Sequence, residues 1–339
     1  MLRAAASGLR RMKFTYSVRS YQLDLFRYIK LRLKAQAQAG RGPLDIAGKG
    51  LQPHVDSLVK EIKRLDLTEN VMELEAYGFT VIPPSKTGIS PEWIGRLRDA
   101  IIGTVERRGD MDLSGWETRT TDVPHMAKNW ELLREDDVFI EAALQPVGLA
   151  MARWLCGQTV SMVGHTLIAK GPTPAERSEN WTQALHSDMH GVPAGGDICH
   201  GCNVSILATD YAGSDDGPTI LAPGSHQAAR APLPDDMKSE CVALEGEAGS
   251  IAVWNDFTWH GSTPRKNPGL RLTLVQQYMR SYMRPIHLWR EEDLAPGQLE
   301  RYPELRKVLA LDHPYPFHEE IERIEEFGWF MDAGTNRFA

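Results

Sequence analysis

Five short runs of β-forming residues lie between residues 158 and 285 and constrain the fold more than any other feature. Turns that contain glycine, proline, aspartate or asparagine separate them. Many short strands with turns between them are typical of a sandwich or barrel, whereas a parallel α/β sheet needs alternating helices. We therefore predict a mainly β core over about 158–282. The runs are QTVSMVGHTLIAK, NVSILATDY, GPTILAPGSH, ECVALEGEAGSIAVWN and LRLTLVQQYMR.

Helical patterns dominate on both sides of this core. Between two of the helices, "YGFTVIPP" (77–84) is an apolar strand that two prolines end. After residue 285 the chain is helical again and rich in proline and aromatic residues. The predicted class is α+β, with a helical N-terminal half packed around the β core and a helical C-terminal flap. The predicted helices span 18–38, 54–67, 91–107 and 139–156, with a Gly-rich linker at 37–49.

Charge is distributed unevenly along the chain. The 339 residues carry a formal net charge of −7, which disfavours a general nucleic-acid binder. Residues 1–40 nevertheless hold nine Lys or Arg and a single acid, Asp24. Their spacing predicts a basic amphipathic helix, which could dock on the acidic remainder of the chain, on a second copy in a homo-oligomer, or on an anionic membrane surface. No run approaches the roughly 18 apolar residues of a membrane span, so no span is predicted.

The four cysteines indicate a reducing, cytoplasmic compartment. The Arg- and Ala-rich start "MLRAAASGLRRMKF" has the composition of an organelle transit peptide, so mitochondrial targeting is the alternative. The segment "CHGC" (199–202) is half of a zinc pattern, but a second cysteine pair that would complete four ligands is missing. We interpret it as a loop that enters a strand.

The segment "ALHSDMHG" (184–191) places potential metal ligands on alternate residues. If 186–190 begins a strand, His186 and Asp188 share one face. A third ligand has to come from a distant strand, and His260 is the best candidate because a buried-looking strand (250–254) leads into it. Two histidines and one carboxylate on one face leave three coordination positions open, as in non-heme Fe(II) oxygenases.

Arg271 follows His260 by eleven residues. The segment "TPRKNPG" is a plausible turn, so we expect the strand 270–279 to return antiparallel to the strand of His260. In that strand Arg271 and Thr273 point one way and the leucines between them the other. An arginine aimed into a barrel needs a partner, and a ligand carboxylate is the natural one. An oxygenase that decarboxylates a keto-acid needs such an anchor near its metal.

Other histidines and tryptophans are weaker candidates. His190 would share the face of the first two ligands about 6.5 Å further along the strand, so we interpret it as a substrate-facing or ordinary polar histidine. His165 could point at the cosubstrate, although a core histidine with satisfied hydrogen bonds is favoured. Trp254, Trp259 and Trp289 are candidates for the wall of an apolar pocket, while tryptophans of this kind commonly belong to the core.

The motifs "LHSDMHG", "DDGPTILAPGSH" and "AGSIAVWNDFTWHGSTPRKNPGLR" resemble the phytanoyl-CoA dioxygenase family in their order and approximate spacing. Also similar are "EAYGFTVI" and Lys170, which precedes the first ligand strand. The resemblance covers roughly residues 70–285 and implies a double-stranded β-helix (jelly-roll, cupin-like) core. We accordingly divide the chain into a basic helical extension (1–69) and an oxygenase domain (70–339) whose cap spans 283–339.

The resemblance implies a role for five residues. His186, Asp188 and His260 would bind Fe(II), while Arg271 and the hydroxyl of Ser262 would hold the C5 carboxylate of 2-oxoglutarate. O₂ is the second cosubstrate, and ascorbate is a candidate reductant. Relatives that halogenate have Gly or Ala at the position of Asp188. With the carboxylate present, the resemblance implies hydroxylation, or a related desaturation or ring rearrangement. The leading expectation is hydroxylation of an unidentified small-molecule or lipid-like substrate, with release of succinate and CO₂.

Three alternatives stay open. The same scaffold could catalyse desaturation or an oxidative rearrangement in a biosynthetic or catabolic pathway. A non-catalytic jelly-roll binding protein is disfavoured by the intact triad, and a cupin-like zinc or manganese enzyme is disfavoured because a hydrolase needs no keto-acid anchor. The sequence does not identify the substrate. The segments 171–183 and 281–339 are predicted to cap the mouth of the pocket, and we expect them to determine substrate specificity.

Overall fold

The computed structural model describes residues 52–175, 183–188 and 198–311. The predicted helix at 18–38, His190 and the last part of the predicted cap lie outside these residues. The helices are α2 (Gln52–Arg64), α3 (Thr68–Tyr77), α4 (Pro84–Thr87), α5 (Pro91–Gly109), α6 (Asp137–Ala143), α7 (Pro146–Cys156), α8 (Gln298–Arg301) and α9 (Leu305–Val308), with 3₁₀ helices η2 (Ser225–Ala228), η3 (Pro234–Lys238) and η4 (Glu291–Asp293). The strands are β1 (Phe79–Ile82), β2 (Ala127–Asn129), β3 (Ser161–Lys170), β4 (Gln183–His186), β5 (Gly201–Leu207), β6 (Thr219–Leu221), β7 (Val242–Ala243), β8 (Ile251–Asn255), β9 (His260–Ser262) and β10 (Arg271–Met279).

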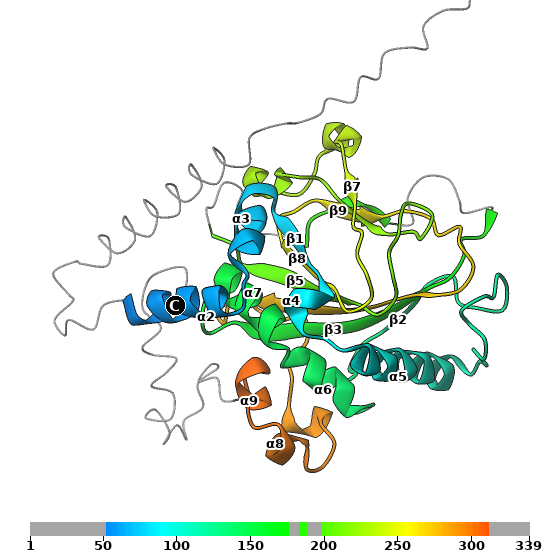
Figure 1. Cartoon of the computed structure of the whole chain (residues 1–339), viewed down its shortest axis with the longest axis horizontal. Coiled ribbons are helices and arrows are strands. Elements are labelled where there is room, and N and C mark those ends of the chain that lie inside the picture. The colour runs from blue at the N-terminus through cyan, green and yellow to red at the C-terminus, as the bar shows by residue number, and fades with distance from the viewer. Residues whose placement is uncertain (1–51, 176–182, 189–197, 312–339) are drawn as a thin grey trace, which may run out of the picture. The chain divides into compact units, whose positions relative to one another are not determined.

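The strands form two antiparallel sheets that face each other (Figure 1). The larger sheet has the order β1-β8-β5-β10-β3-β2, and the smaller has the order β4-β9-β6-β7. Side chains from both sheets pack together between them, including Leu221 of β6 and Trp254 of β8. The β core predicted over 158–282 is confirmed, and the predicted strand at 77–84 joins its edge as β1, paired with β8.

Helices cover the outer face of the larger sheet (Figure 1). α7 packs on β5, β8 and β10, α5 packs on β2 and β3, and α3 packs on β1 and β8. Every residue of β5 is buried, because helices cover one of its faces and the space between the sheets covers the other. The inner face of the larger sheet is therefore free to contribute polar side chains to a site between the sheets.

One predicted helix, 139–156, is interrupted. Pro146 lacks an N–H and restricts the residue before it, so the chain forms α6, a short break and then α7. Gln145 caps α7, because its Oε1 accepts a hydrogen bond from the N–H of Gly148 at 2.8 Å. Among the described residues no single helix is long and apolar enough to cross a membrane; α6 and α7 meet that test only as a pair bent by 45°.

The helix α2 belongs with the β core. Glu61 of α2 forms an ion pair with Arg153 of α7, with atoms 3.2 Å apart. The compact unit that holds the site begins at Leu51, so the predicted division at residue 69 falls inside this unit, within α3.

The expected pairing of the strand of Arg271 with the strand of His260 is wrong. β9 pairs with β4 and β6, whereas β10 pairs with β3 and β5 in the other sheet. Arg265 fixes the connection between them: its guanidinium lies 3.1 Å from the carboxylate of Asp216 and donates to the carbonyl of Gly269 at 2.9 Å. Arg271 and His260 therefore line one pocket from opposite sheets.

Gly78 joins α3 to β1 in a conformation that favours glycine. Its φ is +85°, in the left-handed region, and a Cβ here would meet His226 Nδ1 and Thr258 Oγ1 at 2.5 Å. The Gly78 carbonyl accepts hydrogen bonds from the N–H of Asn255 (2.9 Å) and the hydroxyl of Thr258 (2.8 Å). The glycine of "EAYGFTVI" thus allows the helical layer to approach the loop that leads to His260.

We expect Gly78→Ala to lower the free energy of unfolding by about 2–5 kcal/mol, which urea denaturation would measure. Backbone strain contributes about 1–2 kcal/mol, and displacement of His226 and Thr258 about 1–3 kcal/mol. The control is Gly88→Ala, because Gly88 also has a positive φ (+69°) but nothing lies within 4 Å of its added Cβ. Equal losses in the two variants would contradict the close approach at Gly78.

Candidate active site

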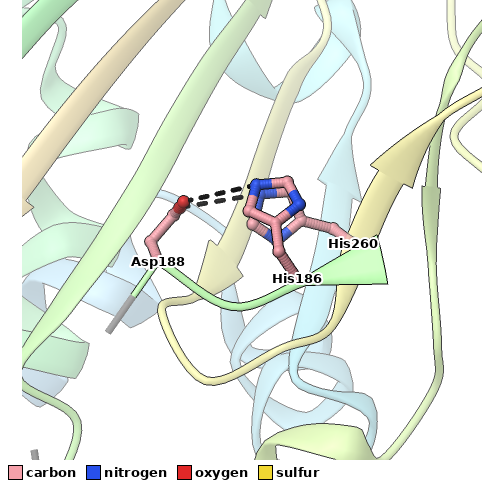
Figure 2. Close-up of side chains that lie close together, drawn as sticks. All are labelled: His186, Asp188 and His260. Carbon is pink, nitrogen blue, oxygen red and sulfur yellow. Dashed lines mark ion pairs between the residues drawn. The ribbon is translucent and has the colours of Figure 1, made fainter. Parts of the chain in front are cut away.

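His186 and His260 come from neighbouring strands of the smaller sheet. They are Cα partners across β4 and β9, and their ring centroids lie 4.2 Å apart (Figure 2). The two strands approach closely at Gly261, where a Cβ would meet the carbonyl oxygen of Gln183 at 2.7 Å. The glycine that follows the second histidine is therefore needed for this pairing.

Asp188 completes the group from a bend after β4. The expectation that a strand begins at residue 186 is wrong, because β4 ends at His186. The N–H of Asp188 donates to the carbonyl of Asp256 at 3.0 Å. Its carboxylate oxygens lie 3.7 Å from His186 Nε2 and 3.6 Å from His260 Nε2 (Figure 2). One ligand atom from each residue lies within 4.8 Å of the others, and no other such group occurs in the described part of the chain.

Hydrogen bonds at Nδ1 orient both imidazoles, whose Nε2 atoms face Asp188. His186 Nδ1 lies 2.9 Å from the carbonyl oxygen of Ala184, and His260 Nδ1 lies 2.9 Å from that of Thr258. A carbonyl oxygen only accepts hydrogen bonds, so each Nδ1 carries the proton and each Nε2 presents its lone pair. His186 Nε2 accepts a hydrogen bond from the amide of Gln183 (3.1 Å), which a metal ion would replace. The donor set fits a divalent first-row metal.

The surroundings keep these side chains in the protonation states and orientations that bind a metal. Burial lowers the pKa of His260, so its imidazole is neutral at neutral pH. Asn203 Nδ2 donates to Asp188 Oδ2 at 2.5 Å and holds the carboxylate in place. Burial raises the pKa of Asp256 to about 8, so this neighbouring carboxyl is uncharged at neutral pH and does not compete for a metal.

A pocket of about 190 Å³ joins these three residues to Arg271. The Arg271 side chain is buried, its Nη1 donates to the carbonyl of Gly217 at 2.5 Å, and its guanidinium carbon lies 4.9 Å from the centre of the Tyr211 ring. Its Nε has no hydrogen-bond partner among the described residues. A buried guanidinium with a donor left over is suited to bind a ligand carboxylate.

Ser262 lines the same pocket, two residues after His260. Its Oγ accepts a hydrogen bond from Lys170 Nζ at 2.6 Å, and the fully buried Lys170 also donates to the carbonyls of Gly217 (3.1 Å) and Thr263. The Ser262 hydroxyl therefore lies in the pocket wall beside the side chain of Lys170. Lys170 is the Cα partner of Arg271, and burial and the charge of Arg271 lower the pKa of Lys170. An anion in the pocket would relieve this repulsion.

The model of the family described as phytanoyl-CoA dioxygenase (PhyH) matches residues 74–273. The chain belongs to the phytanoyl-CoA dioxygenase family. This confirms the resemblance that the motifs indicated.

Individual proteins are similar over most of the chain. Dioxygenase af480 from Aspergillus fumigatus is 24% identical over 275 residues, with 76% of this chain and 82% of that protein covered. The solved structure of the non-heme alpha-ketoglutarate-dependent carbocyclase SnoK from nogalamycin biosynthesis has a TM-score of 0.50 at 18% identity, covering 68% and 91% of the two chains. HygX from Streptomyces hygroscopicus, with nickel and 2-oxoglutarate bound, has a TM-score of 0.49 at 17% identity, covering 66% and 89%. The predicted jelly-roll class of this family member is confirmed.

Of the three candidate tryptophans, Trp254 lines the pocket of this dioxygenase-family chain. Trp259 and Trp289 are buried elsewhere, and their indole N–H groups donate to the carbonyls of Arg230 (2.8 Å) and Met162 (2.9 Å). The sequence could not separate these cases, because the residues next to a tryptophan in the chain do not show whether its ring faces the pocket; the register of β8 decides this for Trp254.

His165 and the "CHGC" segment lie away from the triad. The His165 ring packs edge-on to Phe139 of α6 at 5.9 Å, and burial lowers its pKa to about 3. It is a core histidine, but neither ring nitrogen has a hydrogen-bond partner among the described residues. Cys199 precedes β5 and Cys202 lies in it, so the segment is a loop that enters a strand. The thiol of Cys202 lies 3.9 Å from that of Cys156.

Sequence reasoning missed Asn203 and the contact between Lys170 and Ser262. Asn203 is a polar residue in a fully buried strand that also contains Ser205, which is a weak signal that its side chain faces a site. Lys170 stood out only through the family resemblance. Its partner Ser262 lies in the other sheet, so the sequence carried no direct sign of the contact.

We expect Asp188→Ala to weaken Co(II) binding by at least about 100-fold, because it removes a ligand, and Asn203→Ala to weaken it by about 10–100-fold, because it only frees the carboxylate. Titration of the metal-free protein with Co(II), followed by visible absorption, measures both. His287→Ala is the control, since this partly exposed histidine lies near Asp293 and outside the pocket. Unchanged Co(II) affinity in Asp188→Ala would rule out the triad as the metal site.

Proposed function

We propose that this chain is an Fe(II)- and 2-oxoglutarate-dependent dioxygenase that hydroxylates a small-molecule or lipid-like substrate and releases succinate and CO₂. The observation that carries the proposal is a single pocket that holds two histidine Nε2 lone pairs, the Asp188 carboxylate and the buried guanidinium of Arg271. Family membership agrees with this chemistry.

The donor set alone does not choose the metal, because two imidazoles and a carboxylate also suit zinc, manganese or cobalt. Arg271 makes the difference, since a buried arginine in the pocket is useful to an enzyme that binds an anionic cosubstrate and has no evident role in metal-assisted hydrolysis. Arg271 therefore favours the oxygenase over the cupin-like hydrolase.

In the proposed mechanism His186, Asp188 and His260 hold Fe(II), and Arg271 and Ser262 hold 2-oxoglutarate. Bound there, Fe(II) and 2-oxoglutarate would supply the oxidising chemistry, which these side chains only position. Arg271 would hold the far carboxylate by charge-assisted hydrogen bonds, and the Ser262 hydroxyl would lie beside the same group. Asn203 keeps the Asp188 carboxylate directed at the metal.

Other side chains form the apolar wall of the pocket, and Asp188 bears on which atom is transferred to the substrate. Ile168, Val275 and Trp254 provide apolar wall around the ligands, which strengthens electrostatic interactions within the pocket. Asp188 occupies the position that a halogenase leaves to chloride, so the chain is set for oxygen transfer to the substrate.

The proposed reaction has a fixed stoichiometry. With Fe(II), 2-oxoglutarate and air, the native protein is expected to consume one O₂ for each succinate it forms, measured with an oxygen electrode and by chromatography. Formation of succinate that does not depend on added Fe(II), or its complete absence across a broad panel of small molecules and lipids, would contradict the proposal.

We expect Arg271→Leu to raise the KM for 2-oxoglutarate by about 10–100-fold, the loss of a hydrogen-bonded charge pair. Co(II) affinity should stay within about threefold of native, because Arg271 is not a ligand. Succinate formation at varied 2-oxoglutarate measures the change, and the exposed Arg301→Leu serves as the control. A loss of Co(II) affinity equal to that of Asp188→Ala would show that Arg271 supports the fold of the site rather than the cosubstrate.

A further inference from the structure

Trp254 has a buried hydrogen-bond donor without an acceptor. Its side chain is 4% exposed and lines the pocket, and its Nε1 has no partner among the described residues. An indole N–H left unpaired in a protein interior is unfavourable, so such groups are rare. The other buried tryptophans differ in this respect: the N–H groups of Trp154, Trp259 and Trp289 donate to protein oxygens at 2.8, 2.8 and 2.9 Å.

The strand register places Trp254 beside the metal group. Trp254 on β8 is the Cα partner of Asn203 on β5, so both side chains project from the same face of the larger sheet. Asn203 donates to Asp188, and the indole ring lies 5.4 Å from the ring of His260. The unpaired N–H therefore belongs to a side chain that borders the triad.

Trp254 also borders the surroundings of Arg271. It packs in one buried cluster with Tyr211, whose ring lies under the Arg271 guanidinium at 4.9 Å and whose hydroxyl hydrogen bonds to Thr273. Tyr211 thus connects the tryptophan to the end of the pocket where a ligand carboxylate would be held.

The same pocket contains a second unpaired donor, Arg271 Nε. Asp188 is the only carboxylate among the described lining residues, and it is directed at the histidines. Two buried donors without a protein acceptor, on side chains that line one pocket, fit a ligand that carries several oxygen acceptors. A purely apolar ligand would leave both donors unpaired.

We propose that the indole N–H of Trp254 donates a hydrogen bond to an oxygen of bound 2-oxoglutarate, so that Trp254 binds the cosubstrate together with Arg271 and Ser262. This rests on the proposed function of the pocket. The alternative acceptor is the oxidised substrate, and measuring cosubstrate binding without any substrate distinguishes the two.

The test is the affinity of the full-length, Zn(II)-loaded protein for 2-oxoglutarate, measured by calorimetry with no substrate present. Zn(II) prevents turnover, so binding alone is observed. Trp254→Phe keeps an aromatic ring in the wall and removes the N–H, and we expect it to raise the Kd by about 10–100-fold, the loss of a hydrogen bond to a charged group. Trp289→Phe is the matched control: it removes a buried indole whose partner is the Met162 carbonyl, and its Kd should stay within twofold of native.

A second measurement uses the native side chain and does not depend on how the variant folds. In protein labelled with ¹⁵N-tryptophan, 2-oxoglutarate should shift the indole proton signal of Trp254 downfield and leave that of Trp289 unchanged. A Trp254→Phe variant that binds 2-oxoglutarate as tightly as native, or an unshifted Trp254 signal at saturation, overturns the assignment while the proposed function stands. A native protein that does not bind 2-oxoglutarate at all overturns both.

Discussion

His186 and His260 lie far apart in the sequence and directly opposite each other across β4 and β9. A slip of one residue in this pairing would turn one imidazole to the other face of the sheet, since side chains alternate along a strand. Gly261 allows the strands to approach, and the carbonyls two residues before each histidine fix the Nδ1 proton. Asp188 needs this arrangement as well, because it lies on the short segment that continues β4.

The larger sheet places two basic side chains across the pocket from the metal ligands. Arg271 and Lys170 are cross-strand partners, both are buried, and both donate to the carbonyl of Gly217. Burial and the charge of Arg271 lower the pKa of Lys170 to about 6, and an anion in the pocket would favour its charged form. In the proposed function, a dianionic cosubstrate would bind the metal held by the smaller sheet at one end and the guanidinium of Arg271, in the larger sheet, at the other.

Much of this site could be predicted from the sequence, because short spacings such as H-x-D and a glycine after a histidine are local. His186, Asp188 and His260 are brought together as their spacing indicated. The partner sheet of each strand could not be predicted, since alternation shows which residues share a face and not which strand lies alongside. For the same reason the strand of Arg271 has other neighbours than the sequence predicts, and nothing in the sequence indicates that Asn203 and Trp254 lie opposite each other.

The central claim is that one pocket binds Fe(II) and 2-oxoglutarate together. Adding 2-oxoglutarate to the anaerobic, Fe(II)-loaded native protein tests it directly by visible absorption. We predict a charge-transfer band of the metal chelate that appears only when both Fe(II) and 2-oxoglutarate are present and saturates at one 2-oxoglutarate per chain. Saturating 2-oxoglutarate without any new band would contradict it.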